Sequence, residues 1–224
     1  PALGVRLGIL GPMKLYNYFR SSASFRVRIA LALKGLPYEY HAVHLAKGEQ
    51  FLDDFTQLNS DTLVPMLEID GLRLTQSMAI MEYLDETHPT PALLPKDAAG
   101  RARVRALSQA IACEIHPINN LRILKYLSGT LKLDEDTKNT WYRHWADLGL
   151  QAFDKQLAHS PAGAFCHGDT PGMADCVLVP QIFNAKRFNL ELGGFKRTMA
   201  VFEACMALPA FQQAQPSACP DFEP

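Results

Sequence analysis

The chain has 224 residues, 48% of them apolar, and its 22 basic and 23 acidic residues give a net charge of −1 at pH 7. A chain of this length and apolar content can bury two modest cores, so we expect two domains. The basic residues are dispersed, unlike those of a nucleic-acid-binding protein, and no apolar run reaches the roughly 18 residues of a membrane span. We therefore expect neither nucleic acid nor a membrane among the partners.

The cysteines and the N-terminal residues indicate the cellular compartment of the protein. The cysteines are scattered without a CxxC pair, which indicates reduced thiols and neither a disulfide framework nor a metal site. They are Cys113, Cys166, Cys176, Cys205 and Cys219. No secretory leader is recognisable, and residues 1–12 are interpreted as leader residues, from an alternative start or from cloning, outside the fold. These features predict a cytoplasmic protein without a metal.

The first patterned segments predict a strand, a helix and a second strand. Residues 13–18 (MKLYNY) alternate as a strand does, and residues 24–35 (SFRVRIALALKG) run apolar at helical spacing up to a glycine stop. Residues 38–43 (YEYHAV) alternate again. Elements in this order form a βαβ unit, whose two strands pair in parallel.

A different topology follows in residues 64–77 (VPMLEIDGLRLTQS). Two short strands are joined at Asp70-Gly71, a strong hairpin signal, and Ser77 then opens a helix. The order βαβββα predicts an α/β domain over residues 13–92. Residues 89–97 are rich in proline and are interpreted as an interdomain linker.

The pattern beyond the linker is helical only. Apolar residues recur at i, i+3 and i+4 spacing in residues 103–127, 141–158, 173–188 and 198–208. Pro117 is expected to kink or break the first helix, and the tail after Pro209 is expected to be irregular. Residues 97–224 are therefore predicted to form an all-helical domain.

The segment from Tyr18 to Gly35 (YFRSSASFRVRIALALKG) crowds serines and arginines against a buried helix. A helix N-terminus already concentrates unpaired N–H groups and positive dipole. Arg20 and Arg26 beside Ser21 and Ser22 therefore favour an anion there. Since the rest of the chain carries no basic patch, we expect this arginine group, which includes Arg28, to serve a small ligand.

The order βαβββα followed by helices, with "LVP" before a strand and "QS" before the next helix, resembles the cytosolic glutathione transferases. More narrowly, "SSASFRVRIAL" is similar to the signature of the zeta class and its maleylacetoacetate isomerases, which usually carry cysteine and tryptophan where this chain has Ala23 and Phe25. Residues 76–97, 116–127 and 173–188 also look like that class. The resemblance spans about residues 13–211 and implies a thioredoxin-like N-terminal domain followed by an all-α domain.

The resemblance implies glutathione as cofactor and assigns residues to it. Ser22 matches the serine that supports the glutathione thiolate, with Ser21 as its neighbour; in an arbitrary protein both would be helix caps. Ala23 leaves no protein thiol there for thioredoxin-like exchange. The further glutathione contacts implied are Gln50, Val64, Pro65, Gln76, Ser77, His116 and Asn120. Pro65 would be a cis-proline, although trans is the default for the sequence alone, and His116 could instead be a helix-surface histidine.

The resemblance also implies an acidic substrate. Arginine suits carboxylate and enolate oxygens, so Arg20 and Arg187 join Ser22 and Ser21 as catalytic candidates, the alternative being solvated surface arginines. The expected reaction is glutathione-dependent cis–trans isomerisation of maleylacetoacetate by a homodimer. Some relatives that act on maleylpyruvate carry arginine where this chain has Leu121, which favours maleylacetoacetate. Maleylpyruvate isomerase, a general glutathione transferase and a non-catalytic binding module remain as alternatives.

One capping motif is incomplete. Relatives carry a Ser/Thr-x-x-Asp box where this chain has Gly172 at the cap and Asp175 three residues on. Asp175 can still accept from the Gly172 N–H group. Restoring the cap with Gly172→Thr is expected to stabilise the protein by no more than a few tenths of a kcal/mol.

Overall fold

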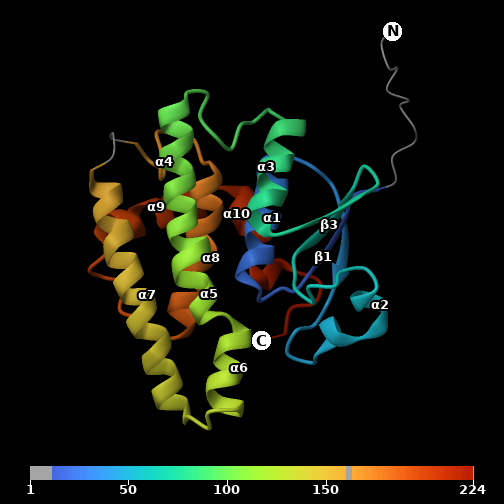
Figure 1. The fold of residues 1–224 in the computed structure, drawn as a ribbon. Coiled ribbons are helices and arrows are strands. Elements are labelled where there is room, and N and C mark those ends of the chain that lie inside the picture. Colours follow the sequence, from blue (N-terminus) through green and yellow to red (C-terminus); the bar gives the residue numbers. More distant parts are fainter. Residues whose placement is uncertain (1–11, 160–162, 224) are drawn as a thin grey trace.

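The structure is a computed structural model that describes residues 12–159 and 163–223. Two parts lie side by side, a small sheet with its helices and a larger set of long helices (Figure 1). The residues interpreted as a leader lie, apart from the last of them, outside the described residues. No helix in the described ranges is long and apolar enough to cross a membrane.

The sheet part follows the predicted order βαβββα. Its strands are β1 (Lys14–Asn17), β2 (Glu39–Ala42), β3 (Met66–Ile69) and β4 (Leu72–Thr75). The sheet order is β2-β1-β3-β4, with β1 and β2 parallel and the other pairs antiparallel. The helices are α1 (Ser22–Leu33) and α3 (Ser77–Thr87). The α/β thioredoxin-like fold is confirmed.

A short helical segment between β2 and β3 was not predicted. It consists of a 3₁₀ turn, η1 (Glu49–Phe51), and α2 (Asp53–Thr56). Elements this short do not display a helical period, so pattern reasoning has nothing to detect.

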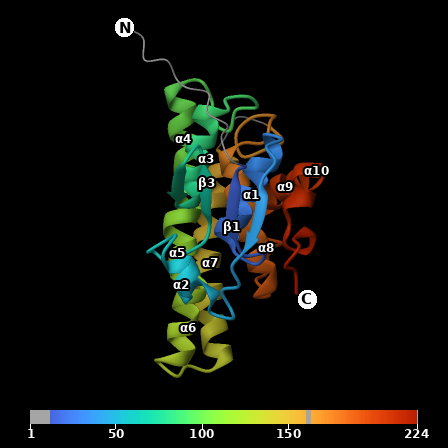
Figure 2. The ribbon, with the colours of Figure 1, turned by 90° about the vertical axis from the view of Figure 1, so that its right-hand side faces the viewer.

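Helix α1 is buried on two sides. Val27 and Leu31 pack with the strands, whereas Phe25 and Ile29 pack in the core of the helical part. Figures 1 and 2 show α1 and α3 between the strands and the long helices. A helix in such a middle layer is expected to be apolar all round, because both faces exclude water, and α1 departs from this at the buried Arg26 and Arg28.

The remainder of the described chain is helical, as predicted. The helices are α4 (Ala98–Gln109), α5 (His116–Asn119), α6 (Leu121–Gly129), α7 (Glu135–Ala158), α8 (Met173–Arg187), α9 (Lys196–Met206) and α10 (Pro209–Ala214). A π-helical stretch, η2 (Ala110–Ile115), joins α4 to α5, and a 3₁₀ turn, η3 (Pro216–Ala218), follows α10.

One local prediction in the helical part holds and one is wrong. Pro117 interrupts the regular helix, as expected: the π-helical stretch η2 lies directly before α5, and the chain leaves the helical conformation at Asn120. A proline removes a backbone N–H, and a π-helical turn is one way in which a helix accommodates it. The tail after Pro209 is not irregular as predicted, since α10 starts at that proline and buries Phe211 and Ala214.

The segment that joins the two parts is anchored by a buried ion pair. Lys34 Nζ lies 2.9 Å from Asp85 Oδ1 and donates to the carbonyls of His88 and Pro91 at 2.7 and 2.8 Å. The Asp85 carboxylate also accepts from the N–H groups of Leu93, at 2.6 Å, and of Leu94. We name this set of contacts the linker clamp. It holds the proline-rich segment in one conformation.

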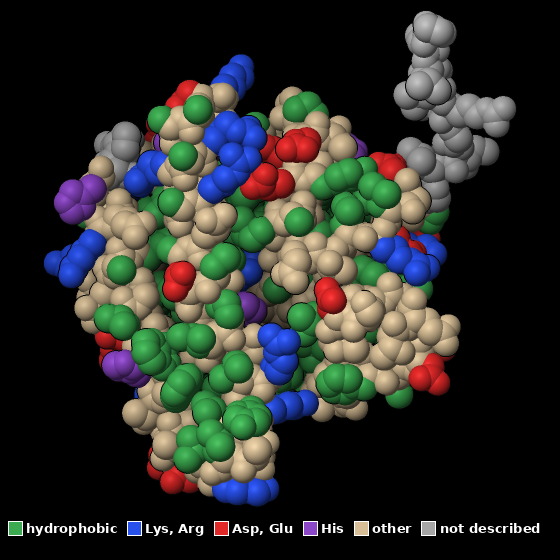
Figure 3. Space-filling model, viewed as in Figure 1, with side chains coloured by type: hydrophobic (Ala, Val, Ile, Leu, Met, Phe, Trp, Pro, Cys, Tyr) green, Lys and Arg blue, Asp and Glu red, His purple; other side chains and the backbone are tan. Residues whose placement is uncertain are grey.

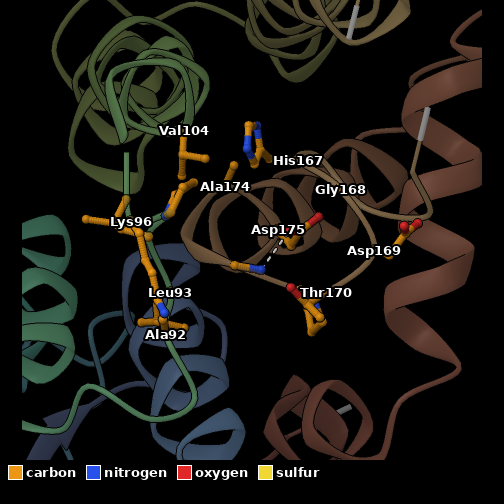
Figure 4. A pocket seen from close by; sticks show the side chains of 14 residues that line it. Ala92, Leu93, Lys96, Val104, His167, Gly168, Asp169, Thr170, Ala174 and Asp175 are labelled. Atoms are coloured by element: carbon orange, nitrogen blue, oxygen red, sulfur yellow. Dashed lines mark hydrogen bonds between the residues drawn. The ribbon is translucent and has the colours of Figure 1, made fainter. Parts of the chain in front are cut away.

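The start of α8 contradicts one expectation. Asp175 accepts from the Gly172 N–H at 2.8 Å, as predicted (Figure 4). It also accepts from the Cys166 N–H at 2.9 Å. However, a Cβ atom at Gly172 would lie 2.8 Å from the carbonyl oxygen of Leu93. The stabilisation expected of Gly172→Thr is therefore wrong, because the threonine would push against backbone of the linker.

Candidate active site

The start of α1 gives its two serines different roles. Ser21 is the N-cap residue, and its Oγ accepts from the Ser24 N–H at 3.2 Å. Ser22 is half-buried in the first turn, and its hydroxyl has no hydrogen bond among the described residues. The hydroxyl of Ser22 is thus available to a ligand, next to the unpaired N–H groups of the helix start.

Arg20 and Arg187 approach the same place from the two parts of the molecule. Arg20 precedes the N-cap of α1 and is exposed, whereas Arg187 is the last residue of α8. Partial burial and then the charge of Arg20 lower the pKa of Arg187. Both arginines also act electrostatically on the Tyr18 hydroxyl. Two cations held close together favour an anion between them.

The start of α3 forms a second polar centre. Gln76 directly precedes Ser77 and has φ +66°, a backbone conformation that residues other than glycine rarely adopt. Ser77 is 6% exposed, and its Oγ accepts a hydrogen bond from Arg26 Nη1 at 3.2 Å. The helix start and the buried guanidinium together make this place electropositive.

Val64, Pro65 and Gln50 lie in the connections around β3. The Val64-Pro65 peptide bond is cis, which confirms what the resemblance implied, and both residues are buried just before β3. Gln50 lies in η1 with 7% of its surface exposed. Its Oε1 is buried without a hydrogen-bond partner among the described residues, so it can accept from a ligand.

Two predicted residues come from the helical part. His116 opens α5 and is half-buried; burial and then the charge of Arg26 lower its pKa to about 3. The imidazole is therefore neutral near pH 7. Asn120 is the N-cap of α6, where its Oδ1 accepts from the Ile123 N–H at 3.1 Å. This capping role was not predicted, and the amide NH₂ remains for a ligand.

Arg28 does not belong to the anion site. Its Nε donates to the carbonyl of Ala214 at 2.9 Å, Nη1 to Asn17 Oδ1 at 3.0 Å, and Nη2 to the carbonyl of Phe19 at 3.0 Å. The expectation that Arg28 serves a ligand is therefore wrong, because its donors hold the C-terminal helices onto the end of β1. The sequence gives no signal that separates it from Arg26.

The C-terminal segment stabilises the site through hydrogen bonds that the sequence analysis did not predict. The Asp221 carboxylate accepts from the Phe19 N–H at 3.2 Å and from the Tyr40 hydroxyl. It thereby fixes the backbone beside Arg20. These partners are about 200 positions apart in the chain, so no local pattern could reveal the contact.

The candidate residues surround the boundary between the two parts. Figure 3 shows a hollow there, between the helices and the sheet part. A hydrogen bond joins Arg26 to Ser77, and the charge of Arg26 acts on His116, so these three residues form one group. Electrostatic interactions join Arg20, Arg187 and Tyr18 in another. Among the described residues, no hydrogen bond links Gln50 or Asn120 to either group. A different hollow beside the linker, lined by Lys96, His167 and Asp169, contains none of the predicted residues (Figure 4).

Comparisons with known proteins identify the family. The family "Glutathione S-transferase, N-terminal domain" matches residues 11–86. Maleylpyruvate isomerase of a Ralstonia species is 52% identical over 210 residues, covering 93% of this chain and 99% of the relative. A probable maleylacetoacetate isomerase of Vibrio cholerae is 50% identical over 210 residues, covering 92% and 97%.

Solved structures agree with these sequence relatives. The holo structure of a maleylpyruvate isomerase, described as a bacterial zeta-class glutathione S-transferase, superposes with a TM-score of 0.92 at 51% identity, covering 94% of this chain and 100% of that chain. Glutathione-bound maleylacetoacetate isomerase of Anaeromyxobacter dehalogenans gives a TM-score of 0.87 at 45% identity, covering 96% and 99%. The chain therefore belongs to the zeta-class glutathione transferases, the family of these isomerases.

Proposed function

We propose that this protein is a glutathione-dependent cis–trans isomerase that converts maleylacetoacetate to fumarylacetoacetate. The observation that carries the proposal is that Arg20, two residues before Ser22 at the start of α1, and Arg187, from the helical part, lie close enough for their charges to interact. An isomerase of this kind needs a thiolate and an anion-holding surface in one place. The close relatives named as isomerases of maleyl acids support the same reaction.

The residues present fit glutathione. The tripeptide carries two carboxylates and two amide groups, and the site offers buried donors and acceptors without internal partners, on Arg26 and Gln50. Ser77 and the start of α3 would hold one carboxylate, and the backbone of Val64, which precedes the cis-proline Pro65, would pair with the peptide as an added strand. His116 and Asn120 would contribute from the helical part.

Glutathione, when bound, supplies the thiolate that adds to the double bond and is expelled after rotation. Ser22 donates its hydroxyl hydrogen toward the sulfur and, with the start of α1, favours the deprotonated thiol. Arg20 and Arg187 hold the substrate carboxylate and the oxygen on which negative charge develops. Because such charge stabilisation lowers the barrier both to addition and to its reversal, the site favours isomerisation over permanent conjugation.

Several finer assignments belong to this proposal. Of the two predicted domains, residues 13–92 would bind glutathione and residues 97–224 would bind the acid substrate. The protein would work as a cytoplasmic homodimer in the breakdown of phenylalanine and tyrosine. Leu121, which is 38% exposed at the start of α6, favours maleylacetoacetate over maleylpyruvate, which is the second candidate substrate because of the relative named for it.

A substrate assay tests the proposal. The purified protein is mixed with each maleyl acid, with and without glutathione, and the trans product is quantified. We expect glutathione-dependent conversion of both acids and a higher kcat/KM for maleylacetoacetate. Conversion of maleylpyruvate alone would favour the second candidate, and conversion of neither would indicate a binding module.

A further inference from the structure

Arg26 is a buried cation with unused hydrogen-bond donors. The residue is 2% exposed, and its Nη1 donates to Ser77 Oγ at 3.2 Å. Nε and Nη2 are also buried, and neither has a hydrogen-bond partner among the described residues. A guanidinium in this condition costs free energy, because burial removes its water and no acceptor replaces it.

Arg28 shows that the fold can satisfy a buried arginine on the same helix. It is likewise 2% exposed, yet all three of its nitrogens donate to oxygen atoms, at 2.9 to 3.3 Å. The two arginines differ in surroundings and not in depth. Arg28 serves the fold, and the unused donors of Arg26 need another explanation.

The described surroundings of Arg26 hold no carboxylate. None of the ion pairs among the described residues includes it; burial lowers its pKa, and the Cys113 thiol is the group that opposes this effect. His116 is neutral near pH 7, since burial and the charge of Arg26 lower its pKa to about 3. The helix start at Ser77 adds further positive potential. The described protein residues therefore supply no carboxylate as the counter-ion of Arg26.

We propose that Arg26 is a positioning residue for the carboxylate of the γ-glutamyl group of glutathione, which it holds through Ser77. Because Nη1 donates to Ser77 Oγ, the hydroxyl hydrogen cannot point at Arg26 and must be donated elsewhere. The N–H groups of the first turn of α3 are donors at the same place. Arg26 thus makes Ser77 a donor and supplies the charge that the carboxylate neutralises. The inference rests on the proposed function, because it takes glutathione as the ligand.

The test separates the carboxylate from the rest of the tripeptide. Calorimetry measures the Kd of glutathione and of 4-aminobutyryl-cysteinyl-glycine, which lacks only the γ-glutamyl carboxylate, for the wild type, Arg26→Gln, Arg26→Lys and Ser77→Ala. The wild type should prefer glutathione by about tenfold or more, the scale of one charge-assisted hydrogen bond. Arg26→Gln should remove most of this preference while changing the Kd of the analogue by less than about twofold.

The conservative variants and the double variant show how Arg26 acts. Arg26→Lys keeps the charge and should keep more of the preference than Arg26→Gln does. Ser77→Ala should lose the preference, and adding Arg26→Gln to it should cause little further loss, because the two residues act as one unit. Thermal melting without glutathione checks folding: Arg26→Gln should melt at or above the wild-type temperature, since an unpaired buried charge is removed.

Each outcome has a distinct meaning. Equal weakening of both peptides by Arg26→Gln would assign Arg26 a structural role and overturn the inference, and so would an unchanged preference. If Arg26→Gln does not fold, an unchanged preference in Ser77→Ala would overturn it, because Ser77 is the residue through which Arg26 is proposed to act. A wild type that binds both peptides equally would also overturn it. A wild type that binds neither peptide would instead contradict the proposed function.

Discussion

Two buried polar regions of this molecule differ in how their charges are satisfied. In the linker clamp, Lys34 has three acceptors, Asp85 and the carbonyls of His88 and Pro91, and the carboxylate of Asp85 receives backbone N–H groups as well. At the boundary between the parts, the guanidinium of Arg26 has one partner and Gln50 Oε1 has none among the described residues. Both regions are buried to a similar degree.

The difference separates structural groups from ligand-binding groups. A buried charge whose partners all belong to the protein stabilises one conformation. Removal of one partner leaves the other charge unpaired in the low-dielectric interior. A buried polar group without internal partners is tolerated when a ligand supplies them. Variants of the first region should therefore change stability, and variants of the second should change binding and turnover.

The largest expected effect lies in the linker clamp. Asp85→Ala should lower the free energy of unfolding by about 3–5 kcal/mol, because it leaves the Lys34 ammonium buried without its counter-ion. Urea denaturation measures the change. The double variant Lys34→Met with Asp85→Leu is the control and should lose less, since no charge stays behind; an equal loss would mean that packing and not charge is responsible.

Ser22→Ala should lower kcat/KM by at least about tenfold, since a hydrogen bond to a charged group contributes about 1.5–3 kcal/mol. Ser21→Ala is the matched control. Its hydroxyl is a cap, so that variant should lose about 1 kcal/mol of stability and less activity. Steady-state kinetics and thermal melting distinguish the two. A larger loss of turnover in Ser21→Ala would exchange the roles.

Arg187→Gln should weaken turnover much more than glutathione binding. The residue is assigned to the acid substrate, and loss of a charge-assisted contact corresponds to about 1.5–3 kcal/mol. Burial raises the pKa of the Tyr18 hydroxyl and the charge of Arg187 opposes this rise, so the variant should raise that pKa further. Calorimetry with glutathione and kinetics with the acid are the measurements. A parallel fall in both quantities would contradict the assignment.

The smallest expected effect concerns a half-exposed ion pair between α3 and α4. Arg105 lies 2.8 Å from Glu82 and lowers the pKa of its carboxyl below the ordinary 4.5. A carboxyl with a lowered pKa stabilises the fold above its unfolded pKa, and this contribution is lost as pH falls through the folded pKa. Glu82→Gln should therefore cost no more than about 1 kcal/mol at pH 7 and nothing in strong acid. A cost independent of pH would refute this explanation.

The sequence predicts the elements whose pattern is local. The alternation of residues 13–18 and the Asp70-Gly71 hairpin correspond to observed strands, because side-chain period and turn chemistry act within a few residues. Helix α10 was missed because its stability comes from burying Phe211 in a distant core. The division into domains of residues 13–92 and 97–224 stays a prediction.

The site is less accessible to sequence reasoning than the fold. The resemblance selects Ser22, Ser77 and Arg187, and the structure reveals properties of these residues that no pattern contains. The distinction between Arg26 and Arg28 depends on which acceptors the folded chain brings near, and the Ala214 carbonyl is 186 positions from Arg28. The support from Asp221 is equally remote in sequence.

The most direct test of the proposed isomerase activity is a thiol titration before and after complete conversion of maleylacetoacetate with substoichiometric glutathione. If the thiolate is added and expelled, a small amount of glutathione converts all the substrate, and the free thiol is unchanged at the end. A loss of one thiol per product formed would contradict the isomerase and identify a transferase that consumes glutathione.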